Sequence, residues 1–363
     1  MAVLVTNDFP PDHGGIQRVM ARLAQEMALQ RERVLVVAPR LPGSDSFDAL
    51  QRYRVLRYRG RGRVLSFAGM FVSLLRARMA CPDFITLASI WFPGGLAACL
   101  LPPILRGRLI VLAHGAEIAP ARRGIRRRLM RYVFDRADVI VANSRFTREL
   151  LVQAGVRGTI SIINPGIDAT PIAPQRSNVP TILSVGRLIP RKGFDTTIAA
   201  LAALLPHYPT ARYEIIGSGP QRAELERLAK HLHVENHVVF LGAVEDEQMR
   251  EAYARAWVFA LPTRSVADDV EGFGVVYLEA AMAQLPTIGG RFSGAEDAIV
   301  AGETGLLVDG TSSADVAAAI ATLLRDRDTA ELMGVRGRDR ALDYFTWRRA
   351  VTELGSLAET AVK

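Results

Sequence analysis

Short apolar segments rich in β-branched residues alternate with longer helical patterns from one end of the chain to the other. In the first half, the segments expected as buried strands are 2–7, 33–39, 84–88, 108–114, 138–144 and 160–166. Apolar residues at helical spacing lie between them, as in 16–29 and 122–136. Strands that are apolar throughout and alternate with helices are typical of a parallel sheet covered on both faces. We therefore expect a doubly wound α/β fold.

A proline-rich stretch divides this pattern into two similar halves. Residues 164–180 carry four prolines and no periodicity, which predicts a linker. Beyond it, strands are expected at 181–187, 211–217, 237–242, 257–262, 285–290 and 305–310. The sequence thus predicts two Rossmann-like domains, residues 1–168 and 169–344, facing across a cleft, and a terminal helix over 345–363. Ligands bind at the carboxyl ends of such strands, so the cleft is the expected site.

Charge is distributed unevenly between the two halves. Residues 1–168 contain 25 arginines, no lysine and 12 acidic residues, a formal charge of +13. The remainder contains 20 basic and 25 acidic residues, a formal charge of −5. This distribution indicates that the first half meets an anionic partner. The alternative is that the arginine excess reflects genome composition.

Cysteine content and apolar runs bear on the location of the protein. Only Cys81 and Cys99 occur, which is too few for a disulfide framework and fits a reducing compartment. The first residues lack the basic segment and the long apolar run of a signal peptide. The longest apolar stretch, 90–105, is broken by prolines and is shorter than the ~20 residues of a spanning helix. We expect a cytoplasmic protein, peripheral on the inner face of the cell membrane.

The stretch VEGFGVVYLEA, residues 270–280, places Glu271 and Glu279 eight positions apart, with no basic residue beside either. An apolar helix is expected to start after Gly274 and to end near Met282, and its first turn offers unpaired N–H groups. Glu271 can reach a hydroxyl bound there, and Glu279, about two turns further, can accept from another pair of hydroxyls. The alternative is a solvated helix residue at 279 and a partner of the helix dipole at 271.

Two glycine-containing loops follow strands of the second half. In GRLIPRKG, Arg187 and Lys192 lie five positions apart and can converge on one diphosphate; two surface cations are the alternative. The segment IGSGPQ, with Gly217 and Gly219, could let backbone approach a nucleotide, although it lacks the third glycine of a dinucleotide fingerprint. A plain strand-to-helix turn explains this second segment equally well.

Two motifs in the first half follow strands in the same way. Gly14 and Gly15 begin the first expected helix and permit close approach of a ligand, as in phosphate-binding turns. His114 ends a buried strand, where a site residue belongs. A tight turn and a structural histidine are the respective alternatives.

Residues 121–136 form a basic amphipathic pattern in which Ile125, Leu129 and Val133 repeat at helical spacing, with six arginines from Arg122 to Arg131. Residues 52–64 add a second arginine cluster. Such helices bind anionic membrane surfaces or nucleic acid; a solvated outer face is the alternative. Few aromatic residues lie among the arginines to stack on bases, so nucleic acid is not an expected partner. The sequence contains no metal-ligand cluster, and no metal is expected.

In this order and spacing, the motifs resemble those of the large retaining glycosyltransferase family of GT-B fold that includes glycogen synthase and bacterial mannosyltransferases. The resemblance spans the whole chain and implies that the final helix crosses back to the N-terminal domain. Its most specific part is the combination of Glu271 and Glu279 with Arg187 and Lys192. The segments NDFPPDHGGIQ, RLIPRKG and DDVEGFGVVYLEA look most like the branch of phosphatidylinositol mannosyltransferases that add a second mannose.

The resemblance implies a role for each motif. Arg187 and Lys192 would bind the donor diphosphate, Glu271 the sugar hydroxyls, and Glu279 the ribose. The implied catalytic residues are His114, which would lie by the anomeric carbon, and Arg187, Lys192 and Glu271. The implied donor-binding residues are Gly15, Gly217, Gly219, Val244, Gly272, Phe273, Gly274 and Glu279. The implied acceptor-binding residues are Asp12, Gly14 and Gly15.

The function implied is transfer of a hexose, with mannose favoured, from a nucleotide diphosphate sugar such as GDP-mannose to a lipid-linked or glycan acceptor. Configuration would be retained, because the leaving phosphate would take the acceptor proton as an oxocarbenium-like sugar forms. No cofactor and no metal would be required. The alternatives are a glucosyl- or N-acetylglucosaminyltransferase with a soluble or polyprenyl-linked acceptor, and a nucleotide-sugar epimerase of the same fold.

Two departures from the branch concern the acceptor. Asp12 and His13 stand where the branch tends to carry a basic residue, and Gly115, Ala116 and Glu117 follow His114 where a second histidine is common. Because of these departures, the resemblance defines the identity of the acceptor less closely than that of the donor.

Overall fold

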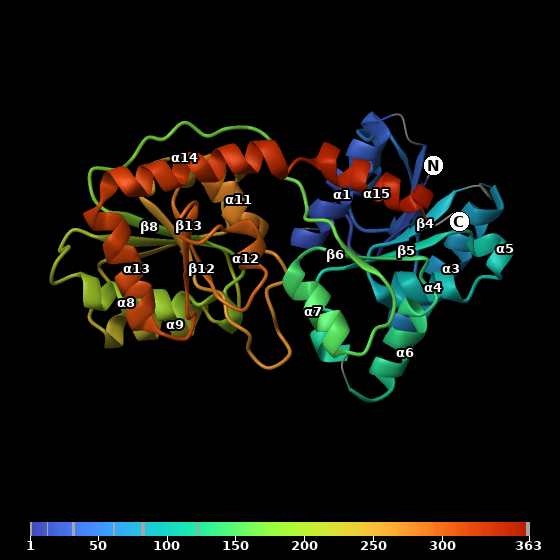
Figure 1. Cartoon of the computed structure of the whole chain (residues 1–363), viewed down its shortest axis with the longest axis horizontal. Coiled ribbons are helices and arrows are strands. Elements are labelled where there is room, and N and C mark those ends of the chain that lie inside the picture. Colours follow the sequence, from blue (N-terminus) through green and yellow to red (C-terminus); the bar gives the residue numbers. More distant parts are fainter. Residues whose placement is uncertain are drawn as a thin grey trace. The chain divides into compact units, whose positions relative to one another are not determined.

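The computed structural model describes residues 2–12, 14–30, 33–60, 62–80, 84–121 and 123–360. His13, Cys81 and Arg122, which the sequence analysis singles out, lie outside the described residues. The chain divides into two compact units (Figure 1), Met1–Gly166 with Trp347–Lys363 and Ile167–Thr346. It therefore passes between units after residues 166 and 346, whereas the sequence analysis placed the boundaries after residues 168 and 344.

The described strands of the first unit form a seven-stranded parallel sheet in the order β3-β2-β1-β4-β5-β6-β7. Their bounds are β1 (Ala2–Val5), β2 (Val34–Pro39), β3 (Arg54–Tyr58), β4 (Ile85–Ala88), β5 (Leu109–Ala113), β6 (Val139–Ala142) and β7 (Ile160–Ile162). Strand order reverses between β1 and β4. Loops that follow these two strands diverge to opposite faces of the sheet and leave a crevice for a ligand.

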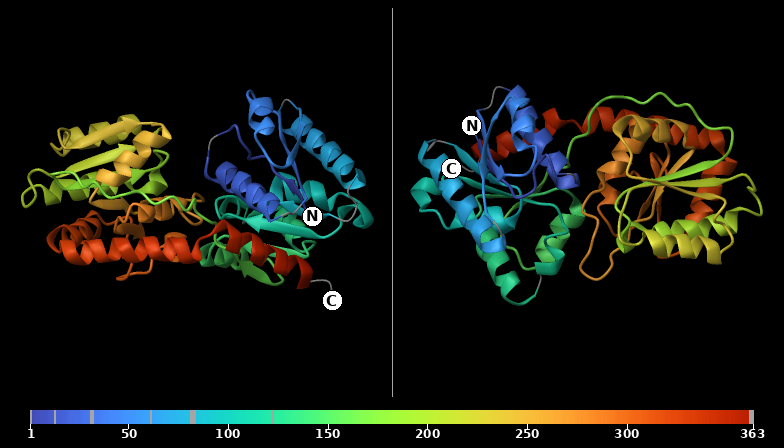
Figure 2. Two further views of the ribbon diagram at one scale, coloured as in Figure 1. Left: turned by 90° about the horizontal axis from the view of Figure 1, so that it is seen from above. Right: turned by 180° about the vertical axis from the view of Figure 1, so that it is seen from behind.

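Helices cover both faces of this sheet. On one face α1 (Gly15–Leu29) packs against α15 (Trp347–Thr360), and on the other lie α3 (Gly62–Ala80), α4 (Leu96–Cys99) and α6 (Gly124–Phe134). Shorter elements are α2 (Ser44–Ala49), η1 (Trp91–Gly95), α5 (Pro103–Arg106), η2 (Ala119–Ala121) and α7 (Arg145–Gln153). The last helix adds Val351 and Leu354 to the core of this unit, and Figure 2 shows its packing from two further sides.

Strand β3 is absent from the sequence prediction, which treated residues 52–64 as an arginine cluster. Arg57 lies within this strand, and its side chain is 4% exposed. Its guanidinium pairs with Asp48 at 2.7 Å, donates to the carbonyls of Pro10 and Pro39, and lies over the Phe9 ring. This arginine stabilises the fold instead of facing a partner, so the expectation of a second anion-binding cluster is wrong at Arg57.

The second unit repeats the design with a six-stranded parallel sheet in the order β10-β9-β8-β11-β12-β13. Its strands are β8 (Thr181–Val185), β9 (Arg212–Ile216), β10 (Val238–Gly242), β11 (Val258–Leu261), β12 (Thr287–Gly290) and β13 (Gly305–Val308). Strand order reverses between β8 and β11, which places the crevice for a ligand at the ends of these two strands. The predicted doubly wound α/β fold is confirmed in both halves.

Two layers of helices enclose the second sheet. On one face α8 (Phe194–Leu204) packs on α9 (Arg222–His231) and α13 (Ser313–Arg325), and on the other α11 (Val275–Met282) packs on α12 (Ala295–Ala298) and α14 (Arg327–Tyr344). The remaining elements are η3 (Pro190–Lys192) and α10 (Asp246–Arg255). Both layers bury their apolar sides in one continuous core with the sheet, which holds the loops at the strand ends.

The proline-rich segment is fastened to the second unit. The amide of Ile172 donates to the carbonyl of Met282 at 2.9 Å, and the amide of Gln175 donates to that of Ala254 at 2.9 Å. The guanidinium of Arg176 reaches the carbonyls of Ala254, Ala283 and Gln284. Since backbone groups that leave water need partners, this segment belongs structurally to the second unit.

Candidate active site

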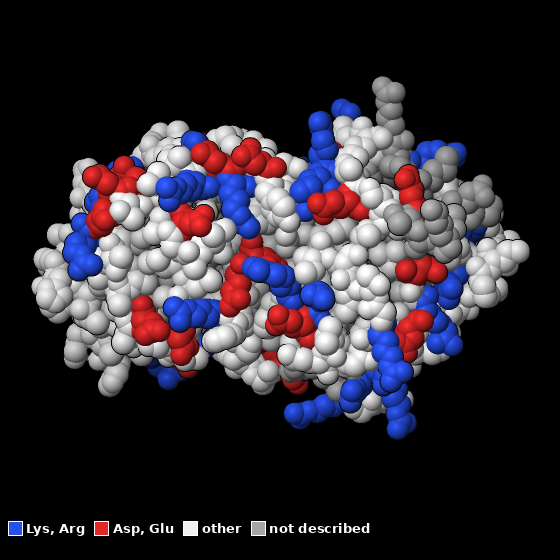
Figure 3. All heavy atoms as spheres, viewed as in Figure 1, with Lys and Arg blue, Asp and Glu red and all other residues white. Residues whose placement is uncertain are grey.

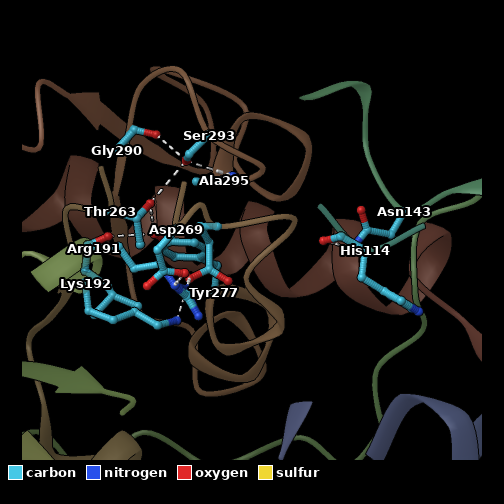
Figure 4. A network of polar contacts seen from close by, with 12 residues as sticks. His114, Asn143, Arg191, Lys192, Thr263, Asp269, Tyr277, Gly290, Ser293 and Ala295 are labelled. Carbon is cyan, nitrogen blue, oxygen red and sulfur yellow. Dashed lines mark hydrogen bonds and ion pairs between the residues drawn. The ribbon is translucent and has the colours of Figure 1, made fainter. Parts of the chain in front are cut away.

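Glu271 of the second unit accepts from two cations on the loop that follows β8. Its Oε2 lies 2.5 Å from Lys192 Nζ and 2.9 Å from the guanidinium of Arg191. The side chains of Lys192 and Glu271 are 9% and 11% exposed. Figure 4 shows Arg191, Lys192 and Asp269 gathered in this network. No basic residue stands beside Glu271 in the sequence, and its partners come from a loop distant in sequence.

The two cations decide the ionisation of this carboxylate. Burial would by itself raise the pKa of Glu271, but the charges of Lys192 and Arg191 outweigh it and hold that pKa below its ordinary value. Both cations contact the same oxygen, Oε2. No described residue pairs with the other oxygen, Oε1, so an ionised carboxylate oxygen is left to accept from a ligand.

Glycines shape the backbone that follows Glu271. Gly274 precedes α11 with a φ of +85°, a conformation that glycine adopts without strain. A Cβ at Gly294 would collide with the backbone of Gly272 and Phe273, so the two loops lie in direct contact there. Phe273 is 3% exposed and its ring packs on Phe345. The side chain of Phe273 is therefore part of the core, and only its backbone can serve a donor.

Glu279 lies on the following helix and has a partner of its own. The hydroxyl of Tyr253 on α10 donates to Glu279 Oε2 at 3.0 Å. The carboxylate is half-buried, and Tyr253 is 2% exposed. A fixed phenol therefore orients Glu279, which is not the freely solvated helix residue of the alternative interpretation.

Arg187 and Lys192 differ in their surroundings. Lys192 is buried against Glu271, whereas Arg187 is exposed, and among the described residues it forms no ion pair. The short turn η3 lies between them, and Gly193 follows it with a φ of +72°. Arg187 is thus available to an anionic ligand without first losing a partner, while Lys192 would have to share or leave Glu271.

Gly217 and Gly219 hold the loop that carries Arg187. A Cβ on Gly217 would collide with the carbonyl of Gly186, and one on Gly219 would collide with the backbone of Leu188. The amide of Leu188 also donates to the carbonyl of Ser218 at 2.9 Å. These glycines are needed for contact between two strand-end loops, whether or not a nucleotide binds there. Val244 lies beyond β10, half-buried against the core.

In the first unit, the loop after β1 brings acidic side chains to the start of α1. Gln17 donates to Asp8 at 3.4 Å and to Asp12 at 3.2 Å. Burial raises the pKa of Asp8, and the charge of His114 offsets part of this rise. Gly15 opens α1, and a Cβ there would meet nothing within 4 Å. No crowding within the described residues calls for glycine at position 15, which leaves room for a ligand at the helix end.

His114 follows β5 and is fixed from three sides. Its Nε2 donates to the carbonyl of Ser89 at 3.0 Å, its amide donates to Glu117 Oε1 at 2.7 Å, and Asn143 donates to its carbonyl at 3.4 Å. A carbonyl oxygen only accepts, so Nε2 carries a proton and, in the neutral ring, Nδ1 holds the lone pair. Figure 4 shows His114 with Asn143 beside it.

Four buried oxygens at the strand ends of the first unit have no hydrogen-bond partner in the described part of the chain. They are Asn7 Oδ1 after β1, Ser89 Oγ after β4, Glu117 Oε2 after β5 and Asn143 Oδ1 after β6. Buried polar atoms are almost always paired in folded proteins. All four accept hydrogen bonds, so this group suits a ligand that donates several, such as a polyol.

The surface of α6 is strongly basic, but the predicted apolar stripe is divided. Val133 is fully buried, whereas Ile125 and Leu129 are 66% and 36% exposed. Arg127 donates to the carbonyl of Ala154 at 3.0 Å and is therefore held by the fold. Figure 3 shows arginine side chains gathered on the surface over this helix. Exposed arginines here are Arg123, which precedes α6, and Arg126, Arg127 and Arg128 within it.

Sequence reasoning missed Arg191 in the second unit and Asp8, Glu117 and Asn143 in the first. Asp8, Glu117 and Arg191 each follow a predicted strand, and Asn143 lies near the end of one, so position alone could have suggested them. Arg191 also lies within the RLIPRKG segment already singled out, next to Lys192. Glu117 contacts the His114 amide only three residues away, but the partners of Arg191 and Asn143 could not be found, because those contacts join loops that are far apart in the sequence.

Within the described ranges, His, Cys, Asp and Glu side chains form no group of three or more placed to hold a metal ion. None of the described helices is long and apolar enough to cross a membrane.

Comparisons with known proteins assign both halves of the chain. Residues 170–340 match the family model of "Glycosyl transferases group 1", and residues 13–170 match that of "Glycosyltransferase Family 4". The GDP-mannose-dependent alpha-(1-6)-phosphatidylinositol monomannoside mannosyltransferase of Mycolicibacterium smegmatis is 34% identical over 98% of this chain and 97% of its own. Its counterpart in Mycobacterium tuberculosis is also 34% identical, over 97% of this chain and 96% of its own.

Solved structures share the fold over the whole chain. HepE of Anabaena in complex with UDP-glucose superimposes with a TM-score of 0.83 at 20% identity, covering 99% of this chain and 100% of its own. Sucrose-phosphate synthase of Thermosynechococcus elongatus gives a TM-score of 0.79 at 21% identity, covering 98% of both chains. At this identity the likeness concerns the fold alone.

Proposed function

The chain belongs to the group 1 glycosyltransferase family and has its GT-B fold, and from this premise we propose that it transfers mannose from GDP-mannose to a phosphatidylinositol mannoside. Membership of a family of transferases argues against the epimerase alternative. One observation carries the proposal: Glu271 is held between Lys192 and Arg191 just before α11. In such an arrangement, cations that could bind a diphosphate would stand next to a carboxylate that could accept from sugar hydroxyls.

The donor diphosphate would lie between Arg187 and the N-terminal end of α11. Arg187 is exposed and unengaged within the described residues, and the free N–H groups of the helix end favour an anion. Lys192, which pairs with Glu271, would also interact with the phosphate as negative charge develops on it. Stabilisation of a leaving group by fixed cations is a large term in catalysis.

Transfer with retention would use the diphosphate itself as the base. The bond between the anomeric carbon and the β-phosphate oxygen breaks, the acceptor oxygen bonds to the same face of that carbon, and the acceptor proton moves to the departing phosphate oxygen. Oε1 of Glu271 would hold a sugar hydroxyl throughout. The proton on His114 Nε2 is engaged by Ser89, which favours a supporting role for this ring over that of a general acid.

Metal independence is part of the proposal. Arg187, Lys192 and the amides at the start of α11 supply positive charge where other transferases use a divalent cation. Carboxylates are the side chains that hold such a cation, and Glu271 is already paired with two basic residues.

For the acceptor, we propose the sugar of a glycolipid. The four unpaired oxygens at the strand ends of the first unit would accept from its hydroxyls. The relatives from Mycolicibacterium and Mycobacterium are named for a phosphatidylinositol monomannoside. A neutral sugar also agrees with the acidic side chains Asp8, Asp12 and Glu117, which would repel a phosphate at this place.

The lipid would be taken from the inner face of the cell membrane. On α6 the exposed Ile125 and Leu129 lie among exposed arginines, a combination that favours an anionic interface. Helix α3, which packs on α4 as α6 does, exposes Val64, Leu65 and Val72. Reversible binding through basic and apolar side chains requires no spanning helix.

A transfer assay tests the proposed function. The purified protein is given phosphatidylinositol monomannoside in vesicles and either GDP-mannose, UDP-glucose or UDP-N-acetylglucosamine. We expect incorporation from GDP-mannose alone, with an α-linked product by NMR. The same donor at roughly 100 times its dissociation constant should stabilise the protein by about 2.7 kcal/mol. Preference for another donor, a β-linked product, or faster transfer to a soluble sugar would contradict it.

A further inference from the structure

Arg191 joins the two loops that meet at the reversal of strand order in the second unit. Its Nε lies 2.8 Å from Asp269, and its terminal nitrogen lies 2.9 Å from Glu271 Oε2. Its own carbonyl accepts from the amide of Arg264 at 2.8 Å. One guanidinium thus binds two carboxylates of the loop after β11 while its backbone holds that loop at a third point.

Lys192 has fewer contacts in this site than Arg191. The one ion pair found for it within the described residues is the contact with Glu271 Oε2. If a donor diphosphate attracts the ammonium, Glu271 keeps a buried position but loses its shorter contact. A buried carboxylate without a cation is costly, so something else has to hold it during transfer.

We propose that Arg191 is a positioning residue for the reaction, which keeps Glu271 in place for the donor sugar while Lys192 serves the diphosphate. This inference rests on the proposed function. An arginine suits the task because its planar group presents donors in a fixed fork and remains charged at all relevant pH values. A lysine has a single charged nitrogen and cannot span both carboxylates with the same geometry.

The charged and titratable groups around Glu271 define what a pH profile would report. Lys192 and Arg191 face it from η3, and Asp269 lies on its own loop beyond Arg191. From α11 the phenol of Tyr277 contributes; burial raises the pKa of Tyr277, so it stays neutral. Loss of Arg191 would leave burial opposed by Lys192 alone, which moves the pKa of Glu271 upward.

Three variants test the proposal: Arg191→Met removes the charge but keeps much of the stem, Arg191→Lys keeps the charge, and Asp269→Asn loosens only the outer contact. For Arg191→Met we expect a fall in kcat of at least about tenfold. The acid limb of its kcat profile should move to higher pH. Binding of GDP, which has no sugar, should stay within about twofold of wild type, because Glu271 does not serve the nucleotide. Arg191→Lys should recover part of kcat, and Asp269→Asn should change it least.

Each contrary result has a distinct meaning. An unchanged kcat and acid limb in Arg191→Met would overturn the proposal, as would a loss of GDP affinity equal to the loss of kcat, which would place Arg191 at the diphosphate. If Arg191→Met does not fold, Arg191→Lys decides: wild-type kcat and acid limb in that variant would overturn the fork argument. Absence of transfer by the wild-type protein from any nucleotide sugar would instead defeat the proposed function.

Discussion

Lys192 Nζ lies 2.5 Å from Glu271 Oε2, so the cation expected at the diphosphate and the carboxylate expected at the sugar contact each other. This pair lies within the same network as Arg191 and Asp269. A substitution at Lys192 or at Glu271 therefore also changes the surroundings of the other residue. Mutational tests of the site need a measurement that separates an effect on the diphosphate from an effect on the sugar.

Lys192→Ala should lower turnover by about 100-fold, because removal of a group that stabilises developing charge commonly costs on the order of 3 kcal/mol. GDP affinity, measured by calorimetry, should fall in the same variant if Lys192 acts on the diphosphate. Glu271→Gln provides the control: it should reduce turnover without lowering GDP affinity, because Lys192 remains in place and loses a competing carboxylate. Retention of more than half of the wild-type rate by Lys192→Ala would remove its assigned role.

Glu279→Ala should mainly raise KM for the donor, because contacts to ribose are equally strong in the ground and transition states. Tyr253→Phe is the matched structural control, since it removes the hydroxyl that donates to Glu279 and nothing else of the side chain. We expect it to raise KM in the same direction by a smaller factor. Steady-state kinetics with varied GDP-mannose measure both effects. A fall in kcat at constant KM would show that Glu279 serves the reacting sugar.

Gly217→Ala should destabilise the protein by about 3 kcal/mol, because its φ of +135° strains an L residue and the new Cβ would collide with the Gly186 carbonyl. Gly15→Ala has open space around the new Cβ and should leave the free energy of unfolding within about 1 kcal/mol of wild type. Denaturant unfolding distinguishes them. Since we place a ligand at Gly15, that variant should lose transfer activity without losing stability.

Local patterns predicted the strands and the order of the motifs but not the contacts between distant loops. Apolar runs such as 109–113 are buried throughout, which is what made them recognisable. Strand β3 was not predicted because Arg54 and Arg57 interrupt its apolar pattern. The burial of Arg57 depends on contacts with Asp48 and Pro10, which sequence spacing cannot place beside it.

The same limit applies at the two sites. Glu271 has no basic neighbour in sequence, and its partners at 191 and 192 reach it because β8 and β11 are adjacent in the sheet. In α6 the spacing of Ile125, Leu129 and Val133 indicated one apolar stripe. The helix instead buries Met130, Val133 and Phe134. Periodicity identifies an amphipathic helix but does not determine which of its apolar residues face the core.

Transfer should continue in the presence of EDTA, because protein cations are expected to neutralise the diphosphate. The measurement is the initial rate of mannose transfer after dialysis against chelator, with and without added Mg²⁺ or Mn²⁺. We expect the rates with and without added ions to agree within about twofold. Loss of activity that either ion restores would show that a metal holds the donor phosphates, and the role proposed for Arg187 and Lys192 would then be wrong.

The last prediction concerns the membrane. Changing Arg123, Arg126 and Arg128 together to Gln should weaken binding to anionic vesicles by roughly a hundredfold, because each arginine near such a surface contributes about 1 kcal/mol. Arg127 is left in place because its contact with Ala154 supports the fold. Flotation with vesicles containing anionic lipid measures the effect. Wild type should float with these vesicles, less so as salt rises, and should not float with neutral ones.

The matched control removes three exposed arginines from the second unit, Arg212, Arg227 and Arg336, by the same change to Gln. It lowers the net charge equally, so continued flotation of this control would assign binding to α6 and exclude a general effect of charge. Ile125→Ser with Leu129→Ser should also reduce flotation, at any salt concentration, because apolar burial is not screened. If wild type stays in the soluble fraction with anionic vesicles at low salt, α6 is a solvated surface and a soluble acceptor becomes the better explanation of the site in the first unit.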